Sequence, residues 1–276
     1  MPKPVDIRIF NIARTTLDRG ACRAWLTDQQ VPEDAIEKLL SSEVTDCANL
    51  VRLCGKRCYS AFVPELNPNV TRVRWDIAKY IDHILESGHG SVIEQVDYSF
   101  AIEGITRVLT SELNRHRAGV ALSEGSMRFI RLTDIEYWLP TSVRPADSDT
   151  PDVAEKKEKT REILALAFKQ AEDNYQALQE VWKDELATQA KFSSKKAITS
   201  LMRRTVPIGV ATGGVWKFNF RALRHICTMR ADEAAEEEIN LLAQMLLQHM
   251  MTAEINFFGD FSINEKGFWQ PKYKKV

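Results

Sequence analysis

The sequence predicts an α+β fold, because strand-like and helix-like patterns alternate along the chain. The clearest strand is VDYSFAIE at residues 96–103, in which apolar residues occupy every second position. Two long helical patterns cover residues 152–184, with an apolar stripe that includes Ile163 and Leu166, and residues 220–257. These patterns predict long helices beside a sheet.

Shorter elements fill the remaining sequence. Alternation of Val5, Ile7 and Ile9 with polar residues predicts a strand near the start, and a charged stretch without a clear pattern follows to about residue 42. Gly88 can end a helix and Gly104 is expected to end the strand before it. The other expected elements are helices at 44–58, 77–85, 105–117 and 190–204, a loop at 62–71 and a second strand region at 129–140.

Composition and charge exclude several classes of protein. The 276 residues carry a formal net charge of -1, so the chain lacks the basic field of a protein that holds long nucleic acid through phosphates. The five cysteines form no CxxC pair, which indicates reduced thiols and a cytoplasmic location. No export signal or membrane-spanning run is visible. We expect one domain over residues 1–276, with a helical excursion at about 152–204 and a basic C-terminal arm at about 266–276.

The stretch RHRAGVALSEGSMR, residues 115–128, concentrates polar chemistry. Taken alone, the tripeptide RHR could be a solvated helix end, because cations interact favourably with the C-terminal end of a helix dipole. Downstream, Glu124, Ser126 and Arg128 occupy alternate positions and would share a side if the segment is extended. A guanidinium binds phosphate through paired donors, and a carboxylate accepts from a ribose hydroxyl or a base N–H. This set of residue types suits a nucleotide.

Two further polar segments have a structural and a functional interpretation. In GHGSVIEQ, residues 88–95, the glycines allow close approach of a ligand, although a histidine in such a turn is more often structural. In NFRALRHICTMR, residues 219–230, Arg221 and His225 would share a helix face while Arg230 points away, so the helix could address two different ligands or parts of ligands. The alternative is a basic helix face balanced by the acidic residues after it.

The sequence indicates neither a metal-binding site nor a side chain that would act as a covalent nucleophile. The histidines are dispersed without an HxxxH or HExxH pair, so no metal site is expected. No family signature surrounds Ser123, Ser126 or Cys227, so none is a convincing nucleophile. If the protein is an enzyme, a cofactor is expected to carry the difficult step.

Three segments in series resemble the flavin-dependent thymidylate synthase family. They are HGSVIEQVDYSFAIEGITRVLTSELNRHR, SEGSMRF and RRTVPIGVATGGVWKFNFRALRHICTMRADEAAEEEI, and together they span residues 88–239. The resemblance implies a central antiparallel sheet packed with long helices, and an FAD-dependent methyltransferase that converts dUMP to dTMP. It further implies methylenetetrahydrofolate as carbon donor, NADPH as reductant, and a homotetramer whose active sites are shared between subunits.

The resemblance also implies roles for individual residues. The catalytic residue would be Arg230, a permanent cation against the uracil that raises electron density at C5. The implied contacts of the uridine nucleotide are Glu112, Arg115, Glu124, Gly125, Ser126, Met127, Arg128, Arg203 and Arg230. The implied contacts of FAD are His89, Ser91, Arg115, His116, Arg117, Glu124, Asn219, Arg221 and His225.

The sequence departs from the family pattern in a few places. Eight residues separate Arg117 from Ser126 where seven are usual, and Ser123, Gln95 and Phe129 stand where asparagine, histidine and tyrosine are common. The additional residue could be absorbed as a bulge or loop before Ser123, or it could reshape the pocket. Two alternatives therefore stay open: a related enzyme that methylates UMP or hydroxymethylates dUMP, and a non-catalytic nucleotide-binding protein of the same fold.

Overall fold

The computed structural model describes residues 2–130, 132, 134–187 and 192–276. The chain divides into two compact units, which are described separately. Unit 1 contains Met1–Phe10, Ala101–Arg115 and Leu122–Trp216, and unit 2 contains Asn11–Phe100, His116–Ala121 and Lys217–Val276. No helix among the described residues combines the length and the apolar character needed to span a bilayer.

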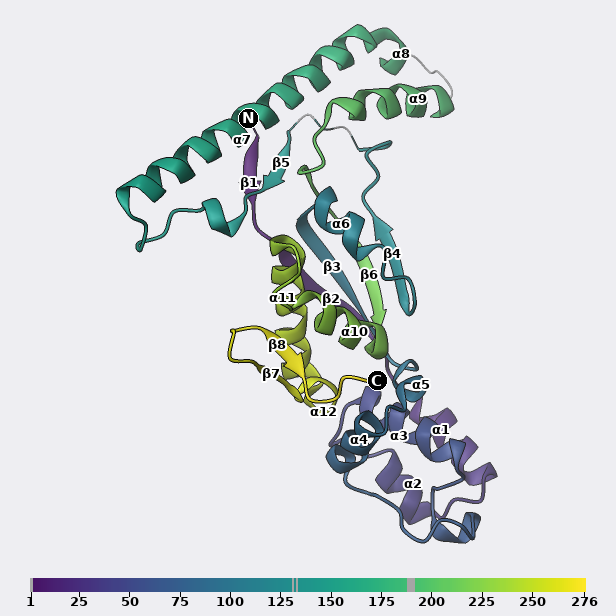
Figure 1. Ribbon diagram of the computed structural model, residues 1–276. Coiled ribbons are helices and arrows are strands. Elements are labelled where there is room, and N and C mark those ends of the chain that lie inside the picture. The colour runs from purple at the N-terminus through teal and green to yellow at the C-terminus, as the bar shows by residue number, and fades with distance from the viewer. Residues whose placement is uncertain (1, 131, 133, 188–191) are drawn as a thin grey trace. The chain divides into compact units, whose positions relative to one another are not determined.

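The fold class is α+β, with an antiparallel sheet of four strands in the order β2-β3-β6-β4 (Figure 1). The strands are β2 (Arg8–Arg14), β3 (Asp97–Thr106), β6 (Ala211–Asn219) and β4 (Val120–Glu124), and each has residues in both units. The Gly125 N–H donates to the Gly213 carbonyl in unit 1, and the Asn219 N–H donates to the Gly119 carbonyl in unit 2, both at 2.9 Å. From the first of these bonds to the second, the residue number falls from 125 to 119 on the β4 side and rises from 213 to 219 on the β6 side, so β4 and β6 are antiparallel.

Strand β3 confirms the alternation seen in the sequence. Tyr98, Phe100 and Ile102 are buried, whereas Asp97 and Ser99 are partly exposed. The expectation that the next glycine ends the strand is wrong, because β3 continues to Thr106.

Gly104 has a positive φ of 73° inside strand β3. A Cβ at this position would lie 2.2 Å from the Asp6 carbonyl oxygen. Glycine is therefore required here for a close approach within a continuous strand, and not as a terminator.

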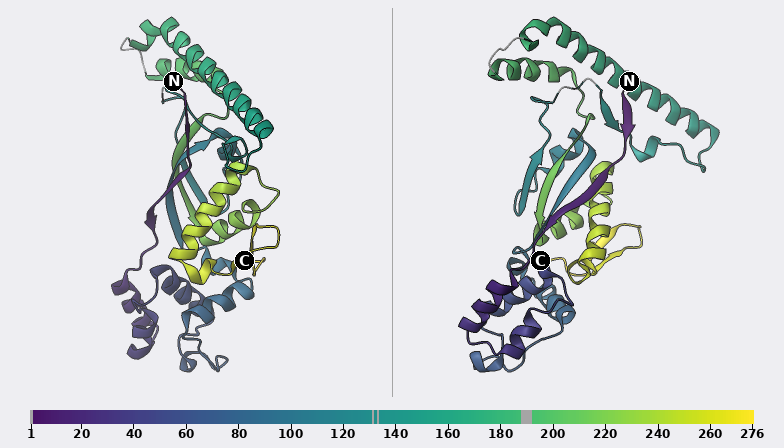
Figure 2. Two further views of the ribbon diagram at one scale, coloured as in Figure 1. Left: turned by 90° about the vertical axis from the view of Figure 1, so that its left-hand side faces the viewer. Right: turned by 180° about the vertical axis from the view of Figure 1, so that it is seen from behind.

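The helices of unit 1 pack around aromatic side chains. They are α6 (Arg107–Leu113), α7 (Pro151–Val181), α8 (Lys183–Ala187) and α9 (Phe192–Met202), with the 3₁₀ turns η2 (Thr141–Val143) and η3 (Arg203–Thr205). Helix α9 lies beside α7, as Figures 1 and 2 both show. Strand β1 (Lys3–Val5) pairs in parallel with β5 (Glu136–Trp138). The ring of Tyr137 in β5 stacks on Phe168 of α7, with 4.3 Å between the ring centres.

Helix α7 confirms the predicted long helix but corrects its apolar stripe. Pro151 occupies the first turn, where its missing N–H has no helical partner to lose. Phe168 and Tyr175 are buried, but the side chains of Ile163 and Leu166 are 68% and 70% exposed. The exposed pair lies outside the stripe that packs in unit 1.

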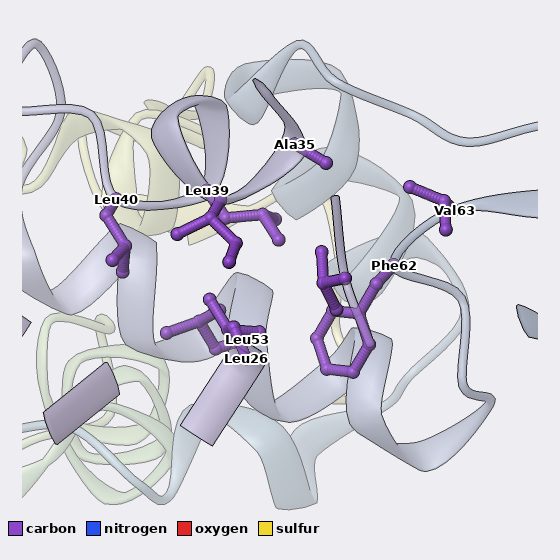
Figure 3. Packing of buried hydrophobic residues seen from close by; sticks show 9 residues of the cluster. Leu26, Ala35, Leu39, Leu40, Leu53, Phe62 and Val63 are labelled. Carbon is purple, nitrogen blue, oxygen red and sulfur yellow. The ribbon is translucent and has the colours of Figure 1, made fainter. Parts of the chain in front are cut away.

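Unit 2 begins with helices that the sequence pattern missed. The charged stretch before residue 42 forms α1 (Arg19–Asp28) and α2 (Glu33–Leu39), and three predicted segments follow as α3 (Asp46–Cys58), η1 (Pro64–Leu66) and α4 (Ile77–Glu86). Leu26, Leu39, Leu53 and Phe62 pack together between these segments (Figure 3). Asp18, whose carboxylate accepts from the Ala21 N–H at 2.9 Å, caps α1.

The C-terminal half of unit 2 is broken where one long helix was predicted. It forms α10 (Phe220–Arg230), α11 (Glu237–Ala253) and α12 (Ile255–Phe258), because Glu236 caps a new helix by accepting from the Glu238 N–H at 2.8 Å. Strands β7 (Phe261–Ile263) and β8 (Trp269–Pro271) then pair antiparallel. Part of the expected arm is therefore a hairpin strand.

Candidate active site

A histidine and arginine cluster forms in unit 2 at the end of α10. The Nε of Arg230 donates a hydrogen bond of 3.1 Å to Nε2 of His116, and the His116 and His225 rings lie 6.0 Å apart in an edge-on arrangement. Burial and the nearby charges of Arg230 and His225 lower the pKa of His116. His116 is therefore neutral near pH 7, which fits its role as acceptor.

This geometry brings two side chains of α10 that were expected to point in different directions close to one ring. His225 and Arg230 both approach the His116 ring, although they are five residues apart on the helix. The separation was inferred from ideal helix angles, but long side chains near the end of a helix can converge on one ring. Arg230 is half-buried, so its cation sits in a partly desolvated place.

The start of α10 holds two of the implied flavin contacts, Asn219 and Arg221. The Asn219 side chain caps the helix by accepting from the Ala222 N–H at 2.8 Å. A Cβ at Gly119, whose φ is 72°, would lie 2.4 Å from the Asn219 amide nitrogen, so glycine is needed there. Arg221 pairs with Glu94 at 2.6 Å, and its Nε donates to the Val276 carbonyl at 3.3 Å.

The GHGS turn lies against the same arginine. His89 and Ser91 are exposed at the short helix α5 (Gly90–Ile93). A Cβ at Gly90 would lie 2.6 Å from the Arg221 Nε, so this turn and the start of α10 approach closely. Arg117 is exposed, and its carbonyl accepts from the Val120 N–H at 3.3 Å.

Unit 1 holds a cavity of about 580 Å³. Among its lining residues are Glu124, Gly125 and Met127 of the predicted nucleotide segment. The Glu124 carboxylate pairs with Arg107 at 2.6 Å and accepts from Asn114 at 3.1 Å. The acid is thus held at a fixed position on one wall of the cavity.

The rest of the predicted segment is not extended. Strand β4 ends at Glu124, and the Phe129 and Ile130 N–H groups both donate to the Ser126 carbonyl, at 2.9 and 3.0 Å. The interpretation that Glu124, Ser126 and Arg128 share one side of a strand is therefore wrong, because a helical turn begins at Ser126. The Arg128 Nε instead donates to the Ser200 hydroxyl at 2.9 Å.

The remaining implied residues of unit 1 lie on α6 and η3. Glu112 is on the last turn of α6, whereas Arg115 follows the helix and is exposed. The predicted helix 105–117 is therefore shorter than expected. Arg203 lines a second cavity of about 250 Å³, together with Arg107 and Met127.

Two residues of unit 1 were missed by the sequence patterns. Arg107 pairs with Glu124 and also donates to the Gly125 carbonyl. Asn114 links Glu124 to Trp216, whose indole N–H donates to the Asn114 amide oxygen at 3.1 Å. One signal was visible: Arg107 stands in the first turn of a predicted helix, where a cation is unfavourable to the helix dipole.

Comparison with known proteins gives consistent matches. The family described as thymidylate synthase complementing protein matches residues 38–253. The flavin-dependent thymidylate synthase of Mycobacterium marinum is 31% identical over 264 residues, which are 95% of this chain and 93% of that protein. That of Corynebacterium glutamicum is 30% identical over 224 residues, 81% and 83% of the two chains.

A solved structure gives the same fold. The crystal structure of a UMP/dUMP methylase from Streptomyces cacaoi, bound with 5-Br dUMP, matches with a TM-score of 0.61 at 15% identity. The match covers 94% of this chain and 96% of the other. At this identity the likeness shows the fold alone.

The fold and these matches define a class of α+β enzymes that depend on a flavin. The chain belongs to the flavin-dependent thymidylate synthase family.

Proposed function

We propose that the protein is an FAD-dependent methyltransferase that converts dUMP to dTMP with methylenetetrahydrofolate and NADPH. The observation that carries this proposal is the Arg230 guanidinium, which is held at 3.1 Å by the neutral His116 in a half-buried position. A fixed, permanent cation beside a uracil ring favours its electron-rich form and makes C5 a better nucleophile. Such a cation performs this task without titrating.

The unit 1 cavity has the size expected for the nucleotide. Its volume lies within the range of about 300–1,000 Å³ that is typical of small-molecule sites. The buried Nε of Arg107 has no hydrogen-bond partner among the described residues, so the guanidinium retains a free donor. We expect Arg107 to orient Glu124 and Gly125 toward the nucleotide, with Ser126, Met127 and Arg128 close by. Glu112, Arg115 and Arg203 are the other residues proposed to contact it.

Residues of unit 2 fit the requirements of a flavin dinucleotide. A diphosphate needs donors on exposed or approachable backbone and on cations. His116, Arg117 and His225 supply such groups near one another in the chain or in space. The other residues of unit 2 proposed to hold it are His89, Ser91, Asn219 and Arg221, and the resemblance also implies Arg115 and Glu124 of unit 1. When bound, FAD would supply the reducing equivalents taken from NADPH.

The family relationship extends the proposal to assembly and location. We propose a homotetramer in the cytoplasm, with active sites shared between subunits. One alternative is C5 methylation of UMP by an enzyme of the same fold, since the chain shares its fold with a UMP/dUMP methylase. Hydroxymethylation of dUMP, and nucleotide binding without catalysis, are the remaining possibilities.

The decisive experiment combines a spectrum with a product assay. The purified protein should show a flavin spectrum and, under anaerobic conditions with NADPH, methylenetetrahydrofolate and dUMP, should form dTMP. A colourless protein that takes up no added FAD would overturn the flavoenzyme proposal. A flavoprotein that modifies UMP but not dUMP would establish the alternative.

Two variants separate the roles of the cations. Arg230→Ala should abolish product formation while bound flavin stays largely unchanged, since its cation is assigned to the uracil. Arg117→Ala should instead weaken flavin retention. Arg144→Ala, which removes an arginine paired with Asp6 elsewhere in unit 1, is the control and should leave both properties intact. Loss of flavin and activity to the same degree in Arg230→Ala contradicts its assignment.

A further inference from the structure

Unit 2 contains a cavity of about 540 Å³, one of whose lining residues, His89, is also proposed to contact the flavin. It lies between the end of α3, the segment that precedes α4, and α4 itself. Five basic side chains line it: Lys56, Arg72, Arg74, His83 and His89. No aspartate or glutamate lines it among the described residues. We call it the basic cavity.

Lys56 is the unusual member of this lining. Its side chain is only 2% exposed and is held between Trp75 and Tyr80, with Nζ 5.2 and 5.3 Å from the two ring centres. Its hydrogen bond is a long one of 3.4 Å to the Ala61 carbonyl. No carboxylate in the described part of the chain lies within 4 Å of it. Aromatic faces offset part of the cost of burying the cation, but no counterion does.

A second buried cation lies behind the first. Arg52 is 4% exposed and donates to neutral acceptors, the carbonyls of Lys38 and Leu39 and the amide oxygen of Asn49, at 2.8, 3.0 and 2.6 Å. Burial, with the charges of Arg52 and Arg74, lowers the pKa of Lys56 to about 8. The basic cavity therefore has a positive wall that nothing in its lining neutralises.

The remaining lining suits a planar polar group. Tyr59 is 60% exposed and presents a large aromatic ring. Asn67 fixes this part of the chain by donating from Nδ2 to the Tyr59 carbonyl at 2.6 Å, and Asn69 adds a second amide. Aromatic rings stack on nucleobases, and amides bond to the edges of bases.

We propose that the basic cavity binds a nucleoside phosphate, with Lys56 and Arg74 at the phosphate and Tyr59 at the base. The ligand is either part of a dinucleotide that the enzyme uses in catalysis or a separate nucleotide. The proposal does not depend on which reaction the enzyme catalyses, although His89 is shared with the proposed flavin site. A failed dTMP assay would leave it standing.

Calorimetric titration of the full-length protein with ADP and with pyrophosphate tests the proposal. The wild type should bind both, and Lys56→Met should bind at least about tenfold more weakly because the charge-assisted bond is lost. Arg74→Gln, a change at an exposed position, should weaken binding in the same direction and guards against misfolding of the first variant. Lys79→Gln, which removes a cation from the exposed face of α4, is the matched control.

The pH dependence gives an independent readout. The groups that face Lys56 are Arg52 on α3, Arg74, and Tyr80 and His83 on α4, and burial raises the pKa of Tyr80 to about 12. Only Lys56 is thus expected to lose its charge between pH 7.5 and about 9.5. Wild-type affinity should fall over this range, whereas Lys56→Arg should keep its affinity because arginine stays charged.

Competition with FAD distinguishes the two possible ligands. If the Lys56-dependent binding of ADP disappears when the protein is saturated with FAD, the ligand is the dinucleotide. If it persists, a separate nucleotide occupies the cavity. No binding of either probe by the wild type, equal binding by Lys56→Met, or a flat pH profile in the wild type would each overturn the proposal.

Discussion

The Arg230 side chain is fixed by His116, whose Nε2 accepts a hydrogen bond of 3.1 Å from the arginine Nε. This contact joins the last residue of α10 to the middle of the RHR tripeptide within unit 2. The histidine can accept only when it is neutral, and burial together with the charge of Arg230 lowers its pKa. The position of the proposed catalytic cation therefore depends on the protonation of a neighbour.

Acidification should release Arg230. The neutral form of His116 is complete above its ordinary pKa of about 6.5, and protonation at lower pH places two cations side by side. We expect kcat/KM for dUMP to fall below about pH 6 in the wild type. His116→Gln retains an acceptor that does not titrate, so its kcat/KM should fall less steeply at acidic pH than that of the wild type. Activity of the two proteins should be compared from pH 5.5 to 8.5.

The His116→Gln variant can also contradict the role proposed for His116. An acid limb of unchanged midpoint and steepness in His116→Gln would show that another group controls the profile. Because the folded-state pKa is lowered, the stability contributed by His116 is present above about pH 6.5 and is lost as the pH falls. Urea unfolding at pH 8 and pH 5.5 should show a smaller difference for the variant than for the wild type.

The sequence predicted the helices and strands whose apolar residues recur regularly better than it predicted contacts between side chains. The alternation in β3 and the length of α7 were both visible, because burial on one face imposes a period of two or 3.6 residues. Helices α1 and α2 were missed because their many charged side chains mask the short buried stripe of Leu26 and Leu39. The break after Arg230 was missed because a capping glutamate among other glutamates gives no distinctive pattern.

For the site residues, too, the sequence did not predict which side chains contact one another. The resemblance supplied a list of residue types, but it could not show that His116 holds Arg230 or that Arg107 holds Glu124, since both contacts join segments that a local pattern treats separately. The helical turn after Glu124 was likewise invisible, because alternation in a short polar segment does not distinguish a strand from a turn.

Arg107 should act on substrate binding through Glu124. Arg107→Ala removes the 2.6 Å ion pair and leaves a half-buried carboxylate without its cation, which costs about 1–3 kcal/mol. We expect KM for dUMP to rise roughly five- to tenfold. Glu124→Gln in the same background tests the coupling. Its further effect should be smaller than in the wild type, because the pair is already broken.

Arg144→Ala serves as the control for Arg107→Ala, because it breaks the 2.6 Å pair with Asp6 in the same unit. It should leave KM for dUMP unchanged. A weaker flavin spectrum in Arg107→Ala, with normal KM, would contradict the role proposed for Arg107.

Glu254 is a buried carboxylate that joins α3 and β3 within unit 2. It accepts hydrogen bonds from the Thr45 hydroxyl at 2.7 Å and the Tyr98 hydroxyl at 2.8 Å. Burial raises its pKa above the ordinary 4.5. Its contribution to stability is therefore complete below about pH 4.5 and decreases as the pH rises through the folded-state pKa.

Two substitutions at Glu254 separate hydrogen bonding from charge. Glu254→Ala leaves both hydroxyls without an acceptor and should lower the free energy of unfolding by about 2–4 kcal/mol. Glu254→Gln removes the charge but keeps an acceptor, so its stability relative to wild type should improve from pH 4.5 to 8. Urea unfolding across this range measures the difference. Glu265→Gln at an exposed position is the control, and a pH-independent difference for Glu254→Gln would refute the raised pKa.

Gly90 should control how the GHGS turn meets α10. A Cβ at this position would lie 2.6 Å from the Arg221 Nε and 2.7 Å from the Val276 carbonyl carbon. Gly90→Ala must therefore displace Arg221 from its pair with Glu94, and the residues that follow Tyr273 from the turn. Because the φ of Gly90 is not positive, the effect is one of space and not of backbone strain.

Flavin titration of Gly90→Ala tests this close approach. We expect FAD affinity to fall about three- to tenfold, because Arg221 is one of the proposed flavin contacts, while the thermal midpoint changes by no more than a few degrees. Gly20→Ala is the matched control, since its nearest neighbour, the Asp18 carboxylate, lies at an ordinary contact distance of 3.4 Å. Unchanged FAD affinity in Gly90→Ala would mean that Arg221 can leave its present position without loss. In that case the turn and the start of α10 bind the flavin through backbone groups, and Arg221→Ala should also leave the FAD affinity unchanged.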